Sequence, residues 1–156
     1  MQSLAEPCTN TNPIQRKRFY FDLDGVLADW DHRKNQGHDH KGQGFYGALE
    51  PFAEGLALYH DLVPHHEVLI ASTAPWDNPW AWTEKRLWVD THLGVSAEKN
   101  LILTHRKDLL IGDFLIDDRT KNGAGSFTGK LILFGSPEFP TWTAVRKYLQ
   151  SLGLLV

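Results

Sequence analysis

The amino-acid sequence predicts an α/β domain in which a five-stranded, mainly parallel, Rossmann-like sheet is flanked by helices. Two observations lead to this prediction. Short apolar runs recur along the chain, and strands that are apolar along their whole length are typical of parallel sheets buried on both faces. Amphipathic segments alternate with several of these runs, which favours a doubly wound sheet. The runs cover residues 18–24, 67–73, 100–104, 113–117 and 130–134.

Each run has the length and composition of a buried strand. The first contains three consecutive aromatic residues and stops at Gly25. The next three are rich in Leu and Ile, and each ends in a polar residue. The last is followed by Gly135. The links at 105–112 and 119–129 are too short for full crossover helices, so we expect a single helical turn in each.

Three segments have helical periodicity. Residues 51–62 begin with Pro51, which suits the first position of a helix, and place their large apolar side chains on one face. Residues 78–93 begin with an Asn-Pro pair, a favourable helix start, and stop before Gly94. Residues 141–152 carry apolar side chains at i, i+3, i+4 and i+7, as an amphipathic helix does.

The chain divides into a polar N-terminal arm, residues 1–17, and a single domain, residues 18–156. Within the domain, residues 31–44 contain three Gly and three His and no apolar side chain. We therefore expect a polar loop there, inserted after the first strand.

Composition limits the classes of function. The chain has 156 residues, of which 42% are hydrophobic, and this suits one globular domain. No apolar run approaches the ~20 residues of a membrane-spanning helix, and the start lacks the apolar core of a secretory signal. With a single cysteine, we expect a cytoplasmic protein. The net charge of −3 argues against an extended nucleic-acid surface. It is compatible with a small phosphorylated substrate that meets a cation or a local basic group.

Two acidic pairs follow buried strands. Asp22 and Asp24 are two residues apart, so on an extended strand both carboxylates point to the same side. Asp117 and Asp118 end another strand, and the carboxyl ends of parallel strands form the ligand edge of such a sheet. Four carboxylates would repel one another without a cation, and oxygen ligands favour Mg²⁺. The alternative is that these residues only cap strands or turns.

These motifs resemble the four motifs of haloacid dehalogenase-like phosphohydrolases, and most closely their 5′(3′)-deoxyribonucleotidase branch. The resemblance spans about residues 19–125 and lies in FDLDGVLADW, LEPFAEGLALYHDL, LIASTAPW and NLILTHRKDLLIGDFLIDDRTKNGAG. One departure is large, because the branch has a helical cap domain where this chain has only the 31–44 loop. We therefore expect a minimal cap and an open pocket.

The resemblance implies a role for each motif residue. Asp22 would be the nucleophile that forms an aspartyl-phosphate, and Asp24 would be the general acid and then the base. Mg²⁺ would be held by the Asp22 side chain, the Asp24 backbone carbonyl and a carboxylate of Asp117 or Asp118.

Other residues would bind the substrate. Thr73, or alternatively Ser72, would donate its hydroxyl to the phosphate, and Lys107 would contact both the phosphate and the nucleophile. Trp30 occupies the position of an aromatic that stacks on the base in the resembling branch, although it also suits a core residue. Phe45 and Tyr46 lie where that branch has further pocket aromatics, although for these two a core role is the better reading.

The function that follows is a Mg²⁺-dependent phosphomonoesterase, a 5′-nucleotidase acting on nucleoside or deoxynucleoside monophosphates. A phosphatase for a sugar phosphate or a nucleic-acid terminus is the alternative, and a catalytically silent phosphate-binding module on the same fold is another. Four Trp residues in 76–88 exceed what one helix stripe can bury, so some face the site or a second copy in a homodimer.

Overall fold

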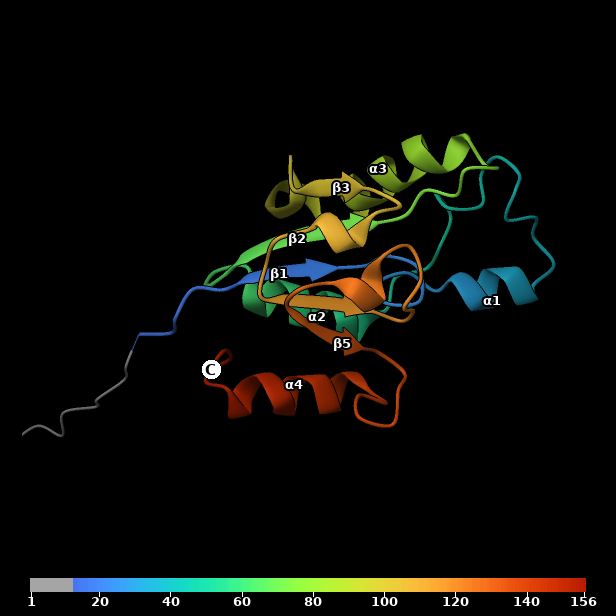
Figure 1. Cartoon of the computed structure of the whole chain (residues 1–156). Helices are drawn as coiled ribbons and strands as arrows, with labels where there is room; N and C mark the ends of the chain where they lie inside the picture. The colour runs from blue at the N-terminus through green and yellow to red at the C-terminus, as the bar shows by residue number, and fades with distance from the viewer. Residues whose placement is uncertain (1–12) are drawn as a thin grey trace, which may run out of the picture.

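The computed structural model describes residues 13–156, which fold around one five-stranded sheet (Figure 1). The strand order is β3-β2-β1-β4-β5, and all four pairings are parallel. The predicted α/β class and five-stranded sheet are thus confirmed. The strands are β1 (Arg18–Phe21), β2 (Glu67–Ser72), β3 (Leu101–Leu103), β4 (Phe114–Asp117) and β5 (Lys130–Leu133).

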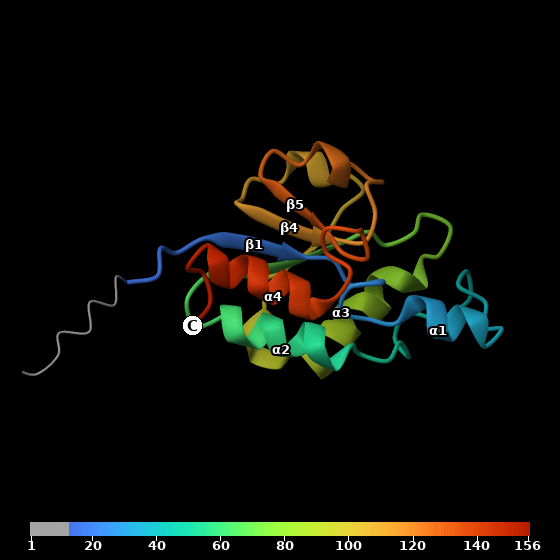
Figure 2. The ribbon, with the colours of Figure 1, turned by 90° about the horizontal axis from the view of Figure 1, so that it is seen from below.

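The two faces of the sheet are covered differently. Figure 2 shows the three long helices together on one face and the short orange turns on the other. The helices are α2 (Ala53–Leu62), α3 (Trp80–His92) and α4 (Trp142–Ser151). Short 3₁₀ segments are η1 (Gly94–Ala97), η2 (Lys107–Leu109) and η3 (Ala124–Ser126). The last two confirm the single helical turns predicted in the short links.

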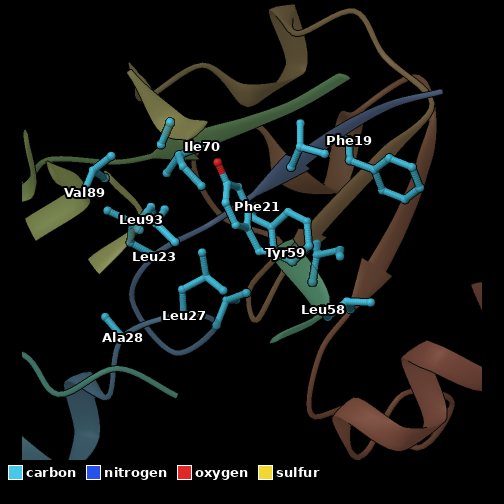
Figure 3. Packing of buried hydrophobic residues seen from close by; sticks show 14 of the residues in the cluster. Phe19, Phe21, Leu23, Leu27, Ala28, Leu58, Tyr59, Ile70, Val89 and Leu93 are labelled. Carbon is cyan, nitrogen blue, oxygen red and sulfur yellow. The ribbon is translucent and has the colours of Figure 1, made fainter. Parts of the chain in front are cut away.

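Strand periodicity sorts the core into two layers. Phe19 and Phe21 of β1 are fully buried in the cluster that faces the helices, where Phe21 meets Tyr59 of α2 edge to face at 5.9 Å between ring centroids (Figure 3). Tyr20, between them in the sequence, points to the opposite face and packs there against Phe127. Burial on both faces explains why β1 is continuously apolar.

The polar stretch at 31–44 differs from the prediction. Its first part continues a short helix, α1 (Trp30–Asn35), rather than a loop. Asp29 caps this helix by accepting a hydrogen bond from the His32 backbone at 3.0 Å. No residue of α1 is fully buried, and only Trp30 packs against the core, so the helix has a cap but no apolar stripe. Figure 1 shows α1 beyond the carboxyl ends of the strands.

Of the predicted N-terminal arm, residues 1–12 lie outside the described part of the chain. Lys17 lies next to β2, where its carbonyl accepts a hydrogen bond from the Glu67 backbone at 2.9 Å. Among residues 13–156, every helix is too short or too polar to cross a lipid bilayer.

Candidate active site

The parallel register brings the two acidic pairs to the same edge of the sheet. Phe21 of β1 pairs with Ile116 of β4, so the residues that follow, Asp22 and Asp117, emerge side by side. The Asp22 backbone N–H extends the ladder by donating to the Ile116 carbonyl at 2.9 Å. Adjacent strands that end together therefore place two carboxylates at one point, as the sequence predicts.

Three carboxylates converge there. Asp22, Asp117 and Asp118 each offer an oxygen, and these oxygens all lie within 4.8 Å of one another. Gly25 makes room for the third. Its φ is +77°, and a Cβ at this position would lie 2.1 Å from Asp118 Oδ2. A side chain at residue 25 would therefore displace the Asp118 carboxylate.

Lys107 is the cation at this cluster. Its ammonium lies 2.6 Å from Asp117 Oδ2 and 3.1 Å from Asp22 Oδ1, and the residue is only 3% exposed. Burial by itself would lower the pKa of Lys107, but the Asp22 and Asp117 carboxylates outweigh it and the pKa is raised. The lysine is therefore held charged, between the two strand ends.

Lys107 and Arg119, whose Nε lies 3.8 Å from Asp118 Oδ2, carry two positive charges against three carboxylates. Burial, reinforced by the charge of Asp22, raises the pKa of Asp117 to about 6 and that of Asp118 to about 7. Without a further cation, both groups hold a proton to a higher pH than an ordinary aspartate does. An all-oxygen set of three carboxylates suits a hard divalent ion such as Mg²⁺, so the residues present fit the metal that the sequence predicts.

Asp24 has a different partner. Its Oδ2 accepts a hydrogen bond from Lys85 Nζ at 2.6 Å, and Lys85 also donates to the Ser72 hydroxyl at 2.7 Å. Burial raises the pKa of Asp24, and the charge of Asp22 adds to this effect, whereas Lys85 opposes it. Asp24 Oδ1 is buried and has no hydrogen-bond partner within residues 13–156.

These groups line a cavity of about 470 Å³, within the ordinary range for small-molecule sites. All but two of the site residues predicted from the sequence contribute to its wall; the exceptions are Ser72 and Phe45. Thr73 lies on the wall, and its hydroxyl donates to the Thr104 carbonyl at 2.8 Å. Ser72 is fully buried and points toward Lys85 instead.

The predicted aromatic residues form a connected group beside the carboxylates. Trp30 and Tyr46 line the cavity, and Trp30 Nε1 lies 3.5 Å from the Tyr46 hydroxyl. Phe45 is 1% exposed and packs against Trp30 at 5.7 Å between ring centroids. It therefore supports Trp30 from behind and does not reach the cavity.

Sequence reasoning missed several residues of this site. Lys85 is one, although a signal was present: it lies on the same face of α3 as the buried Ala81, Trp88 and Val89, where a lysine is unexpected. His105, which lines the cavity, is another. Trp76 also lines the cavity while being 84% exposed, as predicted for some of the four tryptophans in 76–88, and its ring meets that of His105 at 6.1 Å.

The chain is similar to proteins of one family. A family model described as "5' nucleotidase, deoxy (Pyrimidine), cytosolic type C protein" matches residues 32–147. A protein of Vibrio phage KVP40 named "Putative 5'(3')-deoxyribonucleotidase" is 44% identical over 85% of this chain and 84% of its own length. A Bordetella bronchiseptica protein of the same name is 41% identical over 58% of this chain and 46% of its own length.

The human "5'(3')-deoxyribonucleotidase, cytosolic type" is 30% identical over 64% of this chain and 45% of its own length. The chain thus matches less than half of the Bordetella and human proteins, whereas it matches most of the phage protein.

Proposed function

From the premise that this chain belongs to the family of 5′ nucleotidases, deoxy (pyrimidine), cytosolic type C, we propose that it hydrolyses nucleoside or deoxynucleoside monophosphates. This family lies within the haloacid dehalogenase superfamily, so the resemblance seen in the motifs is confirmed. The single observation that supports the proposal best is the convergence of Asp22, Asp117, Asp118 and Lys107 in one cavity.

In the proposed reaction, Asp22 attacks phosphorus and the bond to the ester oxygen breaks, which gives an aspartyl-phosphate and an alcohol. Asp24 gives its proton to the departing oxygen. It then takes a proton from the water that attacks the aspartyl-phosphate, so free phosphate leaves and both aspartates return to their starting states. Both carboxyl groups line the cavity, which supports these roles.

Mg²⁺ is the proposed cofactor. The Asp22 side chain, the Asp24 backbone carbonyl and a carboxylate of Asp117 or Asp118 would hold it. When bound, Mg²⁺ supplies positive charge that lets an anionic phosphate approach an anionic carboxylate. The three carboxylate oxygens within 4.8 Å of one another support this assignment.

We assign phosphate binding to Lys107 and Thr73. Lys107 already contacts Asp22 at 3.1 Å, so its ammonium is placed for a phosphate that Asp22 attacks. Thr73 faces the cavity, and its hydroxyl would turn from the Thr104 carbonyl to the phosphate. Ser72 is the weaker candidate because Lys85 already binds its hydroxyl.

Trp30 is the residue we propose to stack on the base, with Tyr46 beside it and Phe45 behind it. Stacking of a base on an aromatic ring contributes ~1–3 kcal/mol. Trp30→Ala should therefore lower kcat/KM for nucleotides by roughly 5- to 150-fold. Hydrolysis of glycerol phosphate, which has no ring, should change little. Equal losses on both substrates would show that Trp30 has only a structural role.

The proposed function is tested by assaying a panel of phosphate esters with Mg²⁺ and with a chelator. The panel holds ribo- and deoxyribonucleoside monophosphates, sugar phosphates, a 5′-phosphorylated oligonucleotide and 4-nitrophenyl phosphate. We expect turnover only with Mg²⁺ and the highest kcat/KM on a mononucleotide. A preference for sugar phosphates or oligonucleotides would support the alternative substrate, and no turnover of any ester would support a phosphate-binding module.

Two further assignments belong to this proposal. We place the protein in the cytoplasm, as the name of the human relative states for that protein. We also propose a homodimer in which exposed tryptophans near the cavity lie at the interface.

A further inference from the structure

Lys85 is a charged residue in a buried environment, which is unusual for lysine. It lies on the inner face of α3 and is 1% exposed, whereas lysines are almost never fully buried unless they are paired. Burying an ammonium is costly and is compensated only by close anionic or polar partners. A leucine or methionine would fill the same stripe without that cost, so the charge itself requires an explanation.

The partners of Lys85 connect it to one residue of the site. Its ammonium lies 2.6 Å from Asp24 Oδ2 and 2.7 Å from Ser72 Oγ, and it lies over the Tyr46 ring at 4.9 Å from the centroid. Lys85 itself does not line the cavity, but Asp24 and Tyr46 do. Lys85 can therefore act on a substrate only through its neighbours.

The ion pair distinguishes the two oxygens of Asp24. Oδ2 accepts a hydrogen bond from an ammonium, so a proton on that oxygen would have to face a cation. Oδ1 is buried and has no hydrogen-bond partner within the described residues. A proton carried by this carboxyl group therefore belongs on Oδ1, the oxygen that no ammonium faces.

We propose that Lys85 is the positioning residue for Asp24, holding the carboxyl group by Oδ2 in the orientation from which it gives its proton to the leaving group. This inference rests on the proposed function, because it assumes that Asp24 is the general acid. When Asp24 gives its proton to the departing oxygen, the carboxylate that remains is already paired with Lys85. Ser72 holds the ammonium in place from the end of β2.

The inference predicts a dependence on the leaving group. An alcohol needs a proton as it leaves, whereas 4-nitrophenolate is stable without one. We would measure kcat/KM, which reports the step that releases the alcohol, for a nucleoside monophosphate and for 4-nitrophenyl phosphate. Lys85→Met should lower the value for the nucleotide by about 100-fold, the scale of general-acid catalysis. For the aryl ester it should stay within about 3-fold of wild type, because its leaving group needs no acid.

Two further variants accompany this one. Ser72→Ala keeps both charges and removes only the hydroxyl that holds Lys85, so it should give a smaller loss with the same selectivity for the nucleotide. Arg86→Met is the matched control, since Arg86 is the exposed neighbour on the same helix and pairs only with Asp90 within the described residues. It should leave both values unchanged. If Lys85→Met does not fold, as judged by circular dichroism, the comparison on Ser72→Ala decides.

Equal losses on the two substrates would overturn the inference, because they would indicate general damage or a role at the phosphate. Unchanged kcat/KM for the nucleotide would overturn it as well. Failure of the proposed function is a separate outcome: the wild-type protein would then hydrolyse neither ester in the presence of Mg²⁺, and the inference would fall with it.

Discussion

At the scale of single residues, the candidate site holds more carboxylates than positively charged side chains. Asp22 and Asp117 contact the Lys107 ammonium, Asp118 lies 3.8 Å from Arg119, and two of the three carboxyl groups have raised pKa values. Asp24 is paired separately with Lys85. The second pair leaves the three-carboxylate cluster with an unbalanced negative charge, which an added cation would relieve.

The proposed nucleophile can be tested by replacing one of its carboxylate oxygens with an amide nitrogen. Asp22→Asn should abolish turnover, because an amide does not attack phosphorus, while the protein remains folded. Asn has nearly the same shape as Asp and can still accept a hydrogen bond from Lys107. Phosphatase assays together with a thermal melt by circular dichroism would check both expectations. Near-wild-type turnover of this variant would exclude Asp22 as the nucleophile.

Metal binding should be visible in stability as well as in activity. The pKa values of Asp117 and Asp118 are raised to about 6 and about 7, so the folded protein holds protons more tightly than the unfolded chain. This contribution to stability is fully present below the unfolded pKa of about 4 and is lost as the pH rises through 6 and 7. In chelator, the two groups should therefore lower the melting temperature between about pH 5.5 and about pH 8.

Saturating Mg²⁺ should reverse that loss. At 100 times its Kd a ligand adds about 2.7 kcal/mol, which corresponds to roughly 5–10 °C for a domain of this size. The gain should be largest near pH 8 and smaller near pH 5.5, where protons compete for the same oxygens. Asp22→Asn, which changes the one side-chain ligand assigned without an alternative, is the control and should lose most of the gain. Identical melting curves with Mg²⁺ and with chelator near pH 8 would contradict a metal site.

At the scale of elements, sequence patterns predicted the strands and helices that bury apolar side chains. The five apolar runs became strands because both faces of the sheet are covered. The polar last residues of three of them, Asp24, Thr73 and Asp117, line the cavity because parallel strands end at one edge. Helix α1 was missed for the opposite reason. It is six residues long, packs only the half-buried Trp30 against the core and depends on the Asp29 cap, so it leaves no apolar period to detect.

Lys85 was missed because a pairwise contact between distant segments leaves no local pattern. It meets Asp24, 61 positions earlier, and only the packing of α3 against the sheet brings them together. The lysine on the apolar stripe of α3 indicated a buried charge, but the sequence did not identify the partner of that charge. The sequence could not decide between Ser72 and Thr73. In the fold, Ser72 points to Lys85 and Thr73 points to the cavity.

Glu84 connects α3 to the segment that follows α1. Its carboxylate accepts hydrogen bonds from the backbone of Tyr46 at 2.9 Å and of Gly47 at 3.3 Å, and also from Gly44. Hydrogen bonds to a charged group contribute about 1.5–3 kcal/mol. Glu84→Gln should therefore lower the melting temperature by about 4–10 °C and raise KM for nucleotides, because Tyr46 lines the cavity.

Glu54→Gln is the control for that substitution. Glu54 is an exposed residue of α2, and changes at such surface positions usually stay within about 0.5 kcal/mol. If both variants melt at the wild-type temperature, Glu84 does not hold the segment.

At the scale of the whole molecule, the cavity opens beside apolar surface. Of the four tryptophans in the segment from 76 to 88, Trp88 is buried, whereas Trp76, Trp80 and Trp82 are 84%, 49% and 37% exposed. Trp76 and Trp82 both contact the ring of His105, at 6.1 Å and 6.2 Å between centroids. The His105 ring thus links the exposed loop after β2 to the start of α3. Trp76, His105 and Trp82 together form a continuous aromatic surface beside the cavity.

A surface of this kind is expected to associate with a second copy of the chain. Exposed clusters of large apolar side chains on soluble proteins mark sites of binding, and a stable interface covers about 800 Å² on each partner. Sedimentation velocity over a concentration series should therefore show a dimer that dissociates on dilution. The double variant Trp80→Ser and Trp82→Ser should remain a monomer at concentrations where the wild type is dimeric, with unchanged turnover of 4-nitrophenyl phosphate. A wild-type protein that sediments as a monomer at every concentration would contradict the dimer. Substrate contact would then be the remaining role for the exposed tryptophans.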